Sequence, residues 1–68
     1  MTPSEKLKKL RIDRGLTQKQ LAELANIPLK TLLEYEQNRR QLVNARAGIV
    51  IKLADALDIH PRDLIDNI

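Results

Sequence analysis

The side chains that carry charge, and could bind an oppositely charged partner, are unevenly distributed along this sequence. Residues 1–52 contain eleven of the twelve Lys and Arg residues against five acidic residues, a net charge of +6. Residues 53–68 contain Arg62 and four Asp residues, a net charge of −3. This division favours a polyanionic partner that contacts only the first part of the chain. An ordinary solvated surface is the alternative interpretation of the same charges.

No set of residues for catalysis or metal binding can be assembled from the sequence. His60 is the only histidine and cysteine is absent, so a transition-metal site is not expected. Thr17 and Thr31 have no histidine nearby in the sequence to activate them as nucleophiles. Gly15 and Gly48 are isolated and form no phosphate-binding loop. We therefore expect no catalytic residue, no metal, no cofactor and no small-molecule ligand.

The length and the apolar pattern limit the chain to one small domain. Its 68 residues predict a single domain over 1–68 with a thin core, because a chain of about 60 residues buries only about 60% of its unfolded surface. No segment resembles a signal peptide or a membrane span, and the lack of cysteine fits a reducing compartment. We therefore expect a cytoplasmic location and no contact with a membrane.

Start and stop signals predict where the first two helices lie. Residues 2–5 (TPSE) and 17–20 (TQKQ) are capping boxes, in which the threonine and the residue three positions later cap each other's backbone N–H groups. We expect the first helix over about residues 3–14, ended by Gly15 in the left-handed conformation. The second helix follows the second box and ends at Asn26, which also tolerates that conformation.

The remaining helices are marked by proline and by apolar spacing. Pro28 is expected to start a third helix, and small Ala22 lies where the second and third helices cross. A fourth helix is predicted over about residues 46–57, and a fifth from Pro61 almost to the end of the chain. Because no strand alternation is present, the predicted fold class is all-α, with five helices and a helix-turn-helix over about residues 17–37.

Several of these residues together resemble the helix-turn-helix of the Cro and lambda-repressor family. The matching residues are 16–22 (LTQKQLA), Asn26, Ile27, Leu32 and 35–40 (YEQNRR), and residues 52–64 (KLADALDIHPRDL) resemble the family's last two helices. The resemblance covers about residues 7–65. It implies a compact five-helix domain that binds double-stranded operator DNA, usually as a two-fold symmetric dimer.

The resemblance implies base-reading positions on the third helix, which enters the major groove in this family. The residues at these positions are Leu29, Lys30 and Glu34. Lys30 can donate to guanine O6 or N7, Glu34 can accept from a cytosine amino group, and Leu29 can contact only a thymine methyl group. An ion pair between Lys30 and Glu34 on a solvated helix face is the alternative interpretation.

The resemblance also implies phosphate contacts around the second and third helices. Gln18 matches a phosphate-contacting glutamine of the family, and its side-chain amide can donate to a phosphate oxygen. The other expected contacts have hydroxyl or cationic side chains and are Arg14, Thr17, Lys19, Thr31, Arg39 and Arg40. For Gln18 the alternative is a plain polar position at the helix start, and an arginine pair in a loop can serve solubility alone.

Arg11 and Glu36 resemble a family pair that joins the first helix to the end of the third by a salt bridge. Both follow the apolar residues of their helices in phase, so both are expected to point inward. We therefore expect this pair to be structural, holding the third helix at its angle without contacting DNA.

Two functions are compatible with these residues. The first is a prokaryotic or phage transcriptional regulator, expected to be a repressor that occupies a palindromic operator as a homodimer, at least on DNA. The second is a protein-interaction module of the same fold, such as an antitoxin or modulator with weak DNA binding. Its apolar docking surface would comprise Ile12, Leu29, Leu33, Leu42 and Val43.

Overall fold

The computed structural model describes residues 2–65, apart from the side chain of Val43. This part of the chain forms the α-helices α1 (Pro3–Asp13), α2 (Gln18–Ala25), α3 (Leu29–Glu36), α4 (Ala47–Ala56) and α5 (Pro61–Ile65), with a 3₁₀ turn η1 (Leu42–Asn44) before α4. The predicted all-α, five-helix class is confirmed, and each helix begins within one residue of its predicted start. The expected continuation of the last helix falls on residues 66–68, outside the described residues.

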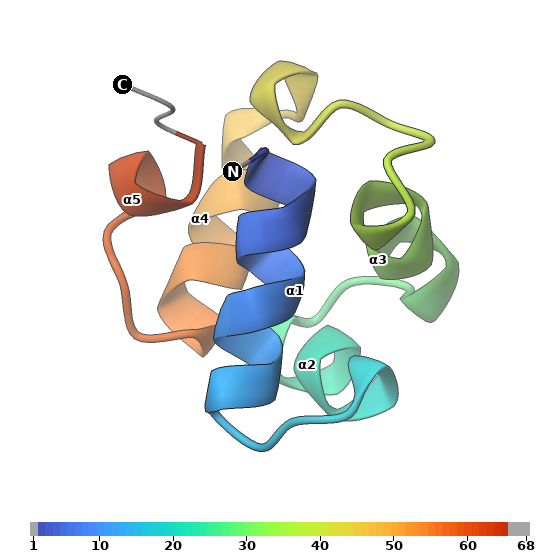
Figure 1. Cartoon of the computed structure of the whole chain (residues 1–68), viewed down its shortest axis with the longest axis vertical. Helices are drawn as coiled ribbons and strands as arrows, with labels where there is room; N and C mark the ends of the chain where they lie inside the picture. The colour runs from blue at the N-terminus through green and yellow to red at the C-terminus, as the bar shows by residue number, and fades with distance from the viewer. Residues whose placement is uncertain (1, 66–68) are drawn as a thin grey trace.

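α1 lies between the two halves of the molecule (Figure 1). It contacts α3 on one side and α5 on the other, while α2 packs on both α3 and α4. In the view of Figure 1, α2 and α3 lie to the right of α1, and α4 and α5 lie to its left. The predicted helix-turn-helix therefore occupies one side of the molecule.

Both predicted capping boxes are present and determine where α1 and α2 begin. The hydroxyl oxygen of Thr2 accepts from the backbone N–H of Glu5 at 3.2 Å, and that of Thr17 accepts from Gln20 at 3.1 Å. The backbone N–H of Thr17 in turn donates to the Gln20 side chain at 2.9 Å. Because these bonds satisfy N–H groups that a helix start otherwise leaves free, they stop the helices from extending backwards. Asn26 adopts the predicted left-handed conformation, with φ of 56°, and ends α2.

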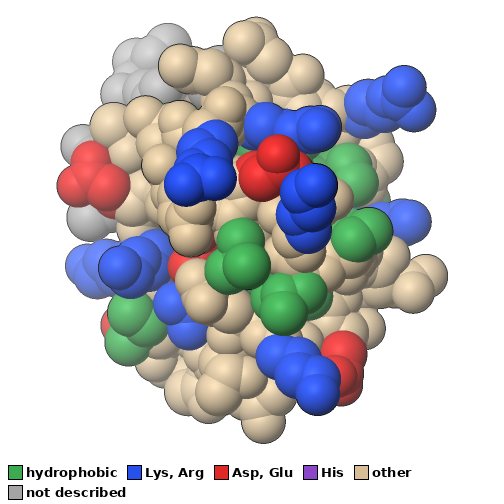
Figure 2. All heavy atoms as spheres, turned by 90° about the vertical axis from the view of Figure 1, so that its right-hand side faces the viewer, with side chains coloured by type: hydrophobic (Ala, Val, Ile, Leu, Met, Phe, Trp, Pro, Cys, Tyr) green, Lys and Arg blue, Asp and Glu red, His purple; other side chains and the backbone are tan. Residues whose placement is uncertain are grey.

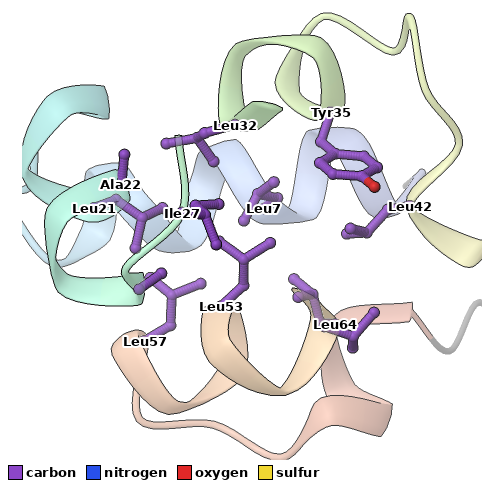
Figure 3. Close-up of a cluster of buried hydrophobic side chains, with 12 residues drawn as sticks. Leu7, Leu21, Ala22, Ile27, Leu32, Tyr35, Leu42, Leu53, Leu57 and Leu64 are labelled. Atoms are coloured by element: carbon purple, nitrogen blue, oxygen red, sulfur yellow. The ribbon is translucent and has the colours of Figure 1, made fainter. Parts of the chain in front are cut away.

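The core is built from aliphatic side chains of every helix, which point towards one another in Figure 3. Its fully buried large side chains are those of Leu7, Leu21, Leu32, Leu53, Leu57 and Leu64. Ala22 is buried at the predicted crossing of α2 and α3, where a larger side chain would separate the two helices. A core drawn from all five helices makes the position of α3 depend on the rest of the domain.

The connection between α3 and α4 differs from the expected loop. It contains η1, and Leu42 in this turn is only 2% exposed. η1 packs on α1, and Figure 3 shows Leu42 beside the ring of Tyr35. The sequence-based interpretation that Leu42 belongs to an exposed docking surface is therefore wrong. Its side chain covers an edge of the small core, where an apolar group is removed from water.

Candidate nucleic-acid interface

α3 presents one side to the core and the other to solvent. Leu32 and Tyr35 are buried, whereas Leu29 is 40% exposed and Lys30 is also exposed. The side chain of Glu34 is 25% exposed. All three residues that were expected to read bases therefore reach the surface of the same helix. Pro28 is the N-cap residue of α3 and offers no side-chain cap.

Cationic side chains gather on the side of the molecule formed by α2 and α3. Figure 2 looks onto this side and shows Lys and Arg side chains surrounding an acidic one, with several hydrophobic side chains between them. Among the residues expected to contact phosphates, the exposed cations are Arg14, Lys19, Arg39 and Arg40. This mixture of donors, an acceptor and apolar groups is the combination that the edges of base pairs and the phosphate backbone require.

Apart from Thr31, the expected phosphate-contacting residues fall into two groups along the chain, one over residues 14–19 and one directly after α3. Arg14 is the C-cap residue of α1, and it lies in the connection before Thr17, whose side chain caps α2. Arg39 and Arg40 follow the end of α3, whereas Thr31 lies in its first turn and is half-buried. The helix-turn-helix thus has donors around the start of α2 and directly after the end of α3.

Arg11 and Glu36 form a short and largely buried ion pair. Nε of Arg11 donates to Oε2 of Glu36 at 2.7 Å, and Nη2 donates to Oε1 at 3.1 Å. The two side chains are 11% and 2% exposed, respectively. The remaining nitrogen of the guanidinium, Nη1, donates to the carbonyl oxygen of Leu16 at 2.8 Å. One guanidinium therefore connects α1, the turn before α2 and the C-terminal end of α3.

Gln18 belongs to the same network. Its Nε2 donates to Oε1 of Glu36 at 3.2 Å, and the residue is half-buried. The structure thus places this residue, which the resemblance assigned to phosphate contact, against the carboxylate that holds α3. Because a side-chain amide nitrogen has two hydrogens, the bond to Glu36 leaves a second donor.

Ser4 is a further residue that holds α3, and the sequence interpretation missed it. It is buried, and its hydroxyl lies 2.6 Å from the carbonyl oxygen of Tyr35 and 2.9 Å from that of Glu36, to which it donates. These carbonyls belong to the last turn of α3, where no regular helical bond satisfies them, and the one other donor among the described residues is the backbone N–H of Asn38, at 3.2 Å from the Tyr35 oxygen. The signal in the sequence is the spacing of Ser4, Leu7 and Arg11, which places all three on one face of α1.

The chain turns back on α3 immediately after its end. Asn38 is left-handed, with φ of 60°, and the backbone N–H groups of Arg39 and Arg40 both donate to the carbonyl oxygen of Glu34, at 2.8 and 3.2 Å. This turn brings Nε of Arg40 to 3.4 Å from Oε1 of Glu34. The partner of Glu34 is therefore Arg40, and the alternative ion pair with Lys30 is not formed in the described structure.

No group of three or more His, Cys, Asp or Glu side chains that could hold a metal ion occurs in the part of the chain that the structure describes. Among the described helices none is both long enough and apolar enough to cross a membrane.

Comparison with known proteins places this geometry in a wider group. A family model described as helix-turn-helix matches residues 7–64. Among solved structures, the chain is similar to a crystal structure of the restriction-modification controller protein C.AhdI from Aeromonas hydrophila, with 35% sequence identity and a TM-score of 0.83. The similarity covers 93% of this chain and 91% of that one. No curated protein matches.

Proposed function

Because the chain belongs to the helix-turn-helix family of Cro- and lambda-repressor-like DNA-binding transcription regulators, we propose that it reads a specific operator. α3 enters the major groove of double-stranded DNA, and occupancy of the operator represses transcription. The observation that carries this proposal is how α3 is held. Its C-terminal end is tied to α1 and α2 through Glu36, while its N-terminal end is exposed. Such a helix can enter a groove with its N-terminal residues without losing its fixed angle.

Three side chains of α3 are proposed to read base pairs. Lys30 donates to guanine O6 or N7, and Leu29 contacts a thymine methyl group. Glu34 accepts from a cytosine amino group. Their exposure on one helix supports this assignment.

Two groups of donors are proposed to contact the phosphates that flank these bases. Gln18 uses the amide hydrogen that Glu36 does not engage. The other proposed contacts are made by Arg14, Thr17, Lys19, Thr31, Arg39 and Arg40. Each phosphate that a cation neutralises is expected to steepen the dependence of log K on log salt by about 0.9.

We further propose that two copies bind together, because one small domain reads only a few base pairs. A homodimer, at least on DNA, would occupy a palindromic operator with half-sites one helical turn apart, about 10 bp from centre to centre. A footprint that covers a single half-site, with one bound copy, would contradict this arrangement.

The experiment is to select bound fragments from genomic DNA and to footprint the best of them. We expect binding to a selected duplex at least about a thousandfold tighter than to a shuffled duplex in about 0.15 M salt. Weak binding that ignores sequence would contradict the proposal, and it would favour the protein-interaction module instead.

Two substitutions divide base reading from phosphate contact. Lys30→Ala should relax the preference at one base position, whereas Arg39→Ala should weaken binding to all duplexes and reduce the salt slope by about 0.9. Arg62→Ala is the control, because it removes the same charge from α5, on the side of α1 away from α3 (Figure 1). If Lys30→Ala and Arg39→Ala changed the base preference and the salt slope alike, the assignment of base reading to Lys30 and phosphate contact to Arg39 would be refuted.

A further inference from the structure

Glu34 and Arg40 form the second ion pair of the described residues, and it lies within the proposed DNA-binding face. Nε of Arg40 is 3.4 Å from Oε1 of Glu34, and the two side chains are 60% and 25% exposed. Both residues were assigned separate partners on DNA, a phosphate for Arg40 and a cytosine for Glu34. In the free protein these two groups engage each other instead.

The backbone brings the two side chains together. The left-handed turn at Asn38 reverses the chain, and both Arg39 and Arg40 donate their backbone N–H groups to the Glu34 carbonyl oxygen. Arg40 is therefore held near Glu34 even when the two side chains are apart. Because exposed ion pairs are weak, the side-chain contact can open and close without disturbing this turn.

From this geometry, and given the proposed function, we propose that Glu34 is a positioning residue. It withholds Arg40 from DNA phosphates until a cytosine amino group takes the place of Arg40 at the Glu34 carboxylate. On a duplex without a cytosine opposite Glu34, the pair stays closed. On the operator, the cytosine amino group donates to the Glu34 carboxylate, and Arg40 turns to the neighbouring phosphate. Recognition of one base then adds a phosphate contact that other sequences do not obtain.

The electrostatics of the two situations differ. A phosphate attracts the Arg40 guanidinium strongly, since its planar donors match phosphate oxygens. Moving Arg40 there on a wrong sequence would leave the Glu34 carboxylate without a donor, facing a polyanion. A cytosine amino group removes this penalty because it supplies the missing donor.

Arg39 provides an internal comparison, because it follows the same turn and is also exposed. Within residues 2–65 no ion pair involves Arg39. We therefore expect Arg39 to contact phosphate on every duplex, and Arg40 only on the operator. Removal of Arg39 should therefore weaken binding to every DNA sequence, whereas removal of Arg40 should weaken binding to the operator alone.

The first test measures salt-dependent binding of Glu34→Gln and Glu23→Gln to a random duplex made of A·T base pairs only, in which no cytosine can face Glu34. Glu23 is an exposed acid on α2, so Glu23→Gln makes the same change of net charge away from Arg40. Glu34→Gln should steepen the slope of log K against log salt by about 0.9 relative to Glu23→Gln, and raise affinity about fivefold in about 0.1 M salt. Equal slopes for the two variants would overturn the inference.

The second test compares Arg40→Ala with Arg39→Ala on the selected operator and on the random duplex. Arg40→Ala should lower the slope by about 0.9 on the operator and leave it unchanged on the random duplex, whereas Arg39→Ala should lower both. If Arg40→Ala lowered the slope equally on both duplexes, the proposed exchange of Glu34 for a phosphate as the partner of Arg40 would be refuted. If the wild-type protein preferred no duplex, the proposed function would fail, and the random-duplex comparison would still decide whether Glu34 withholds Arg40.

Discussion

Two arginine–glutamate ion pairs end on α3, two residues apart in the sequence, and they differ in every property that sets their strength. The pair at Glu36 is short, forked and almost completely removed from water. The pair at Glu34 is longer and more exposed, with the Arg40 side chain 60% and the Glu34 side chain 25% exposed. Arg11 reaches Glu36 from a different helix, whereas Arg40 reaches Glu34 from the turn that directly follows α3.

We infer from this difference that the same two residue types serve different purposes at the two positions. In a buried pair, the loss of one partner leaves an uncompensated charge in a poorly solvated place, so the pair strongly favours one geometry. In a partly exposed pair, another donor or acceptor can take the place of either partner at a lower cost. The first kind of pair suits a helix that must keep its angle, and the second suits a contact that can be exchanged for DNA.

The largest expected effect comes from removing one partner of the buried pair. Glu36→Ala should lower the free energy of unfolding by about 3 kcal/mol or more, because Arg11 is left buried without its carboxylate. For a domain of this size that corresponds to a fall in Tm of about 12 °C or more, measured by circular dichroism. Glu34→Ala is the matched control, and it should lower the free energy of unfolding by less than about 1 kcal/mol. Similar losses for the two variants would contradict the contrast between the pairs.

A double variant sharpens the reason for that loss. Replacing both partners, as Arg11→Met with Glu36→Leu, should be less destabilising than Glu36→Ala alone, since no charge is then left buried. A double variant as unstable as the single one would indicate that the hydrogen bonds to Leu16 and Gln18, not the orphaned charge, dominate.

The next effect concerns the neutral contact that holds the same end of α3. Ser4→Ala should lower the free energy of unfolding by about 1–3 kcal/mol, because it removes a buried hydrogen bond to the Tyr35 carbonyl oxygen and takes its donor from the Glu36 carbonyl oxygen. Urea unfolding measures the change. Lys8→Ala, at an exposed position of the same helix, should lie within about 0.5 kcal/mol of the wild type. A Ser4→Ala variant as stable as this control would exclude Ser4 from holding α3.

The exposed pair should contribute little to stability. Arg40→Ala should change the free energy of unfolding by no more than about 1 kcal/mol, since its guanidinium is mostly in water. Thermal unfolding without DNA measures this. A larger loss would mean that the pair is structural, and it would remove the ground for treating it as exchangeable.

The smallest effect is expected for a third carboxylate, that of Glu5 in the first capping box. Hydrogen bonds from the backbone N–H and the hydroxyl of Thr2 lower the pKa of Glu5 below its ordinary value. A carboxyl group whose pKa is lowered in the folded state stabilises the fold at pH values above its ordinary pKa. This stabilisation is lost as the pH falls through the lowered pKa. Glu5→Gln should therefore have a slightly lower Tm than the wild type at pH 7, and the difference should close on acidification. A Tm difference that stayed constant as the pH fell below the pKa of Glu5 would contradict the attribution of this stability to the Glu5 carboxylate.

The sequence was sufficient for features that depend on residues a few positions apart. Both capping boxes, the left-handed residue that ends α2 and the start of every helix were predicted from such signals. The buried position of Ala22 agrees with the expected crossing of the second and third helices at this small residue. Leu42 was misplaced because it lies outside the regular helices, where no helical spacing marks it as buried, and only the packing of η1 on α1 removes it from water.

What the sequence by itself determined is therefore the set of helices and the spacing of the helix-turn-helix, since caps, turns and helical periodicity act within a few residues. The tertiary structure decided which polar groups meet. Ser4 lies 31 residues from the carbonyl that it holds, and Gln18 donates to the carboxylate of Glu36, 18 residues away. Such pairings depend on distances and burial that exist only once the helices have packed, because desolvation determines which of several compatible charges form a lasting bond.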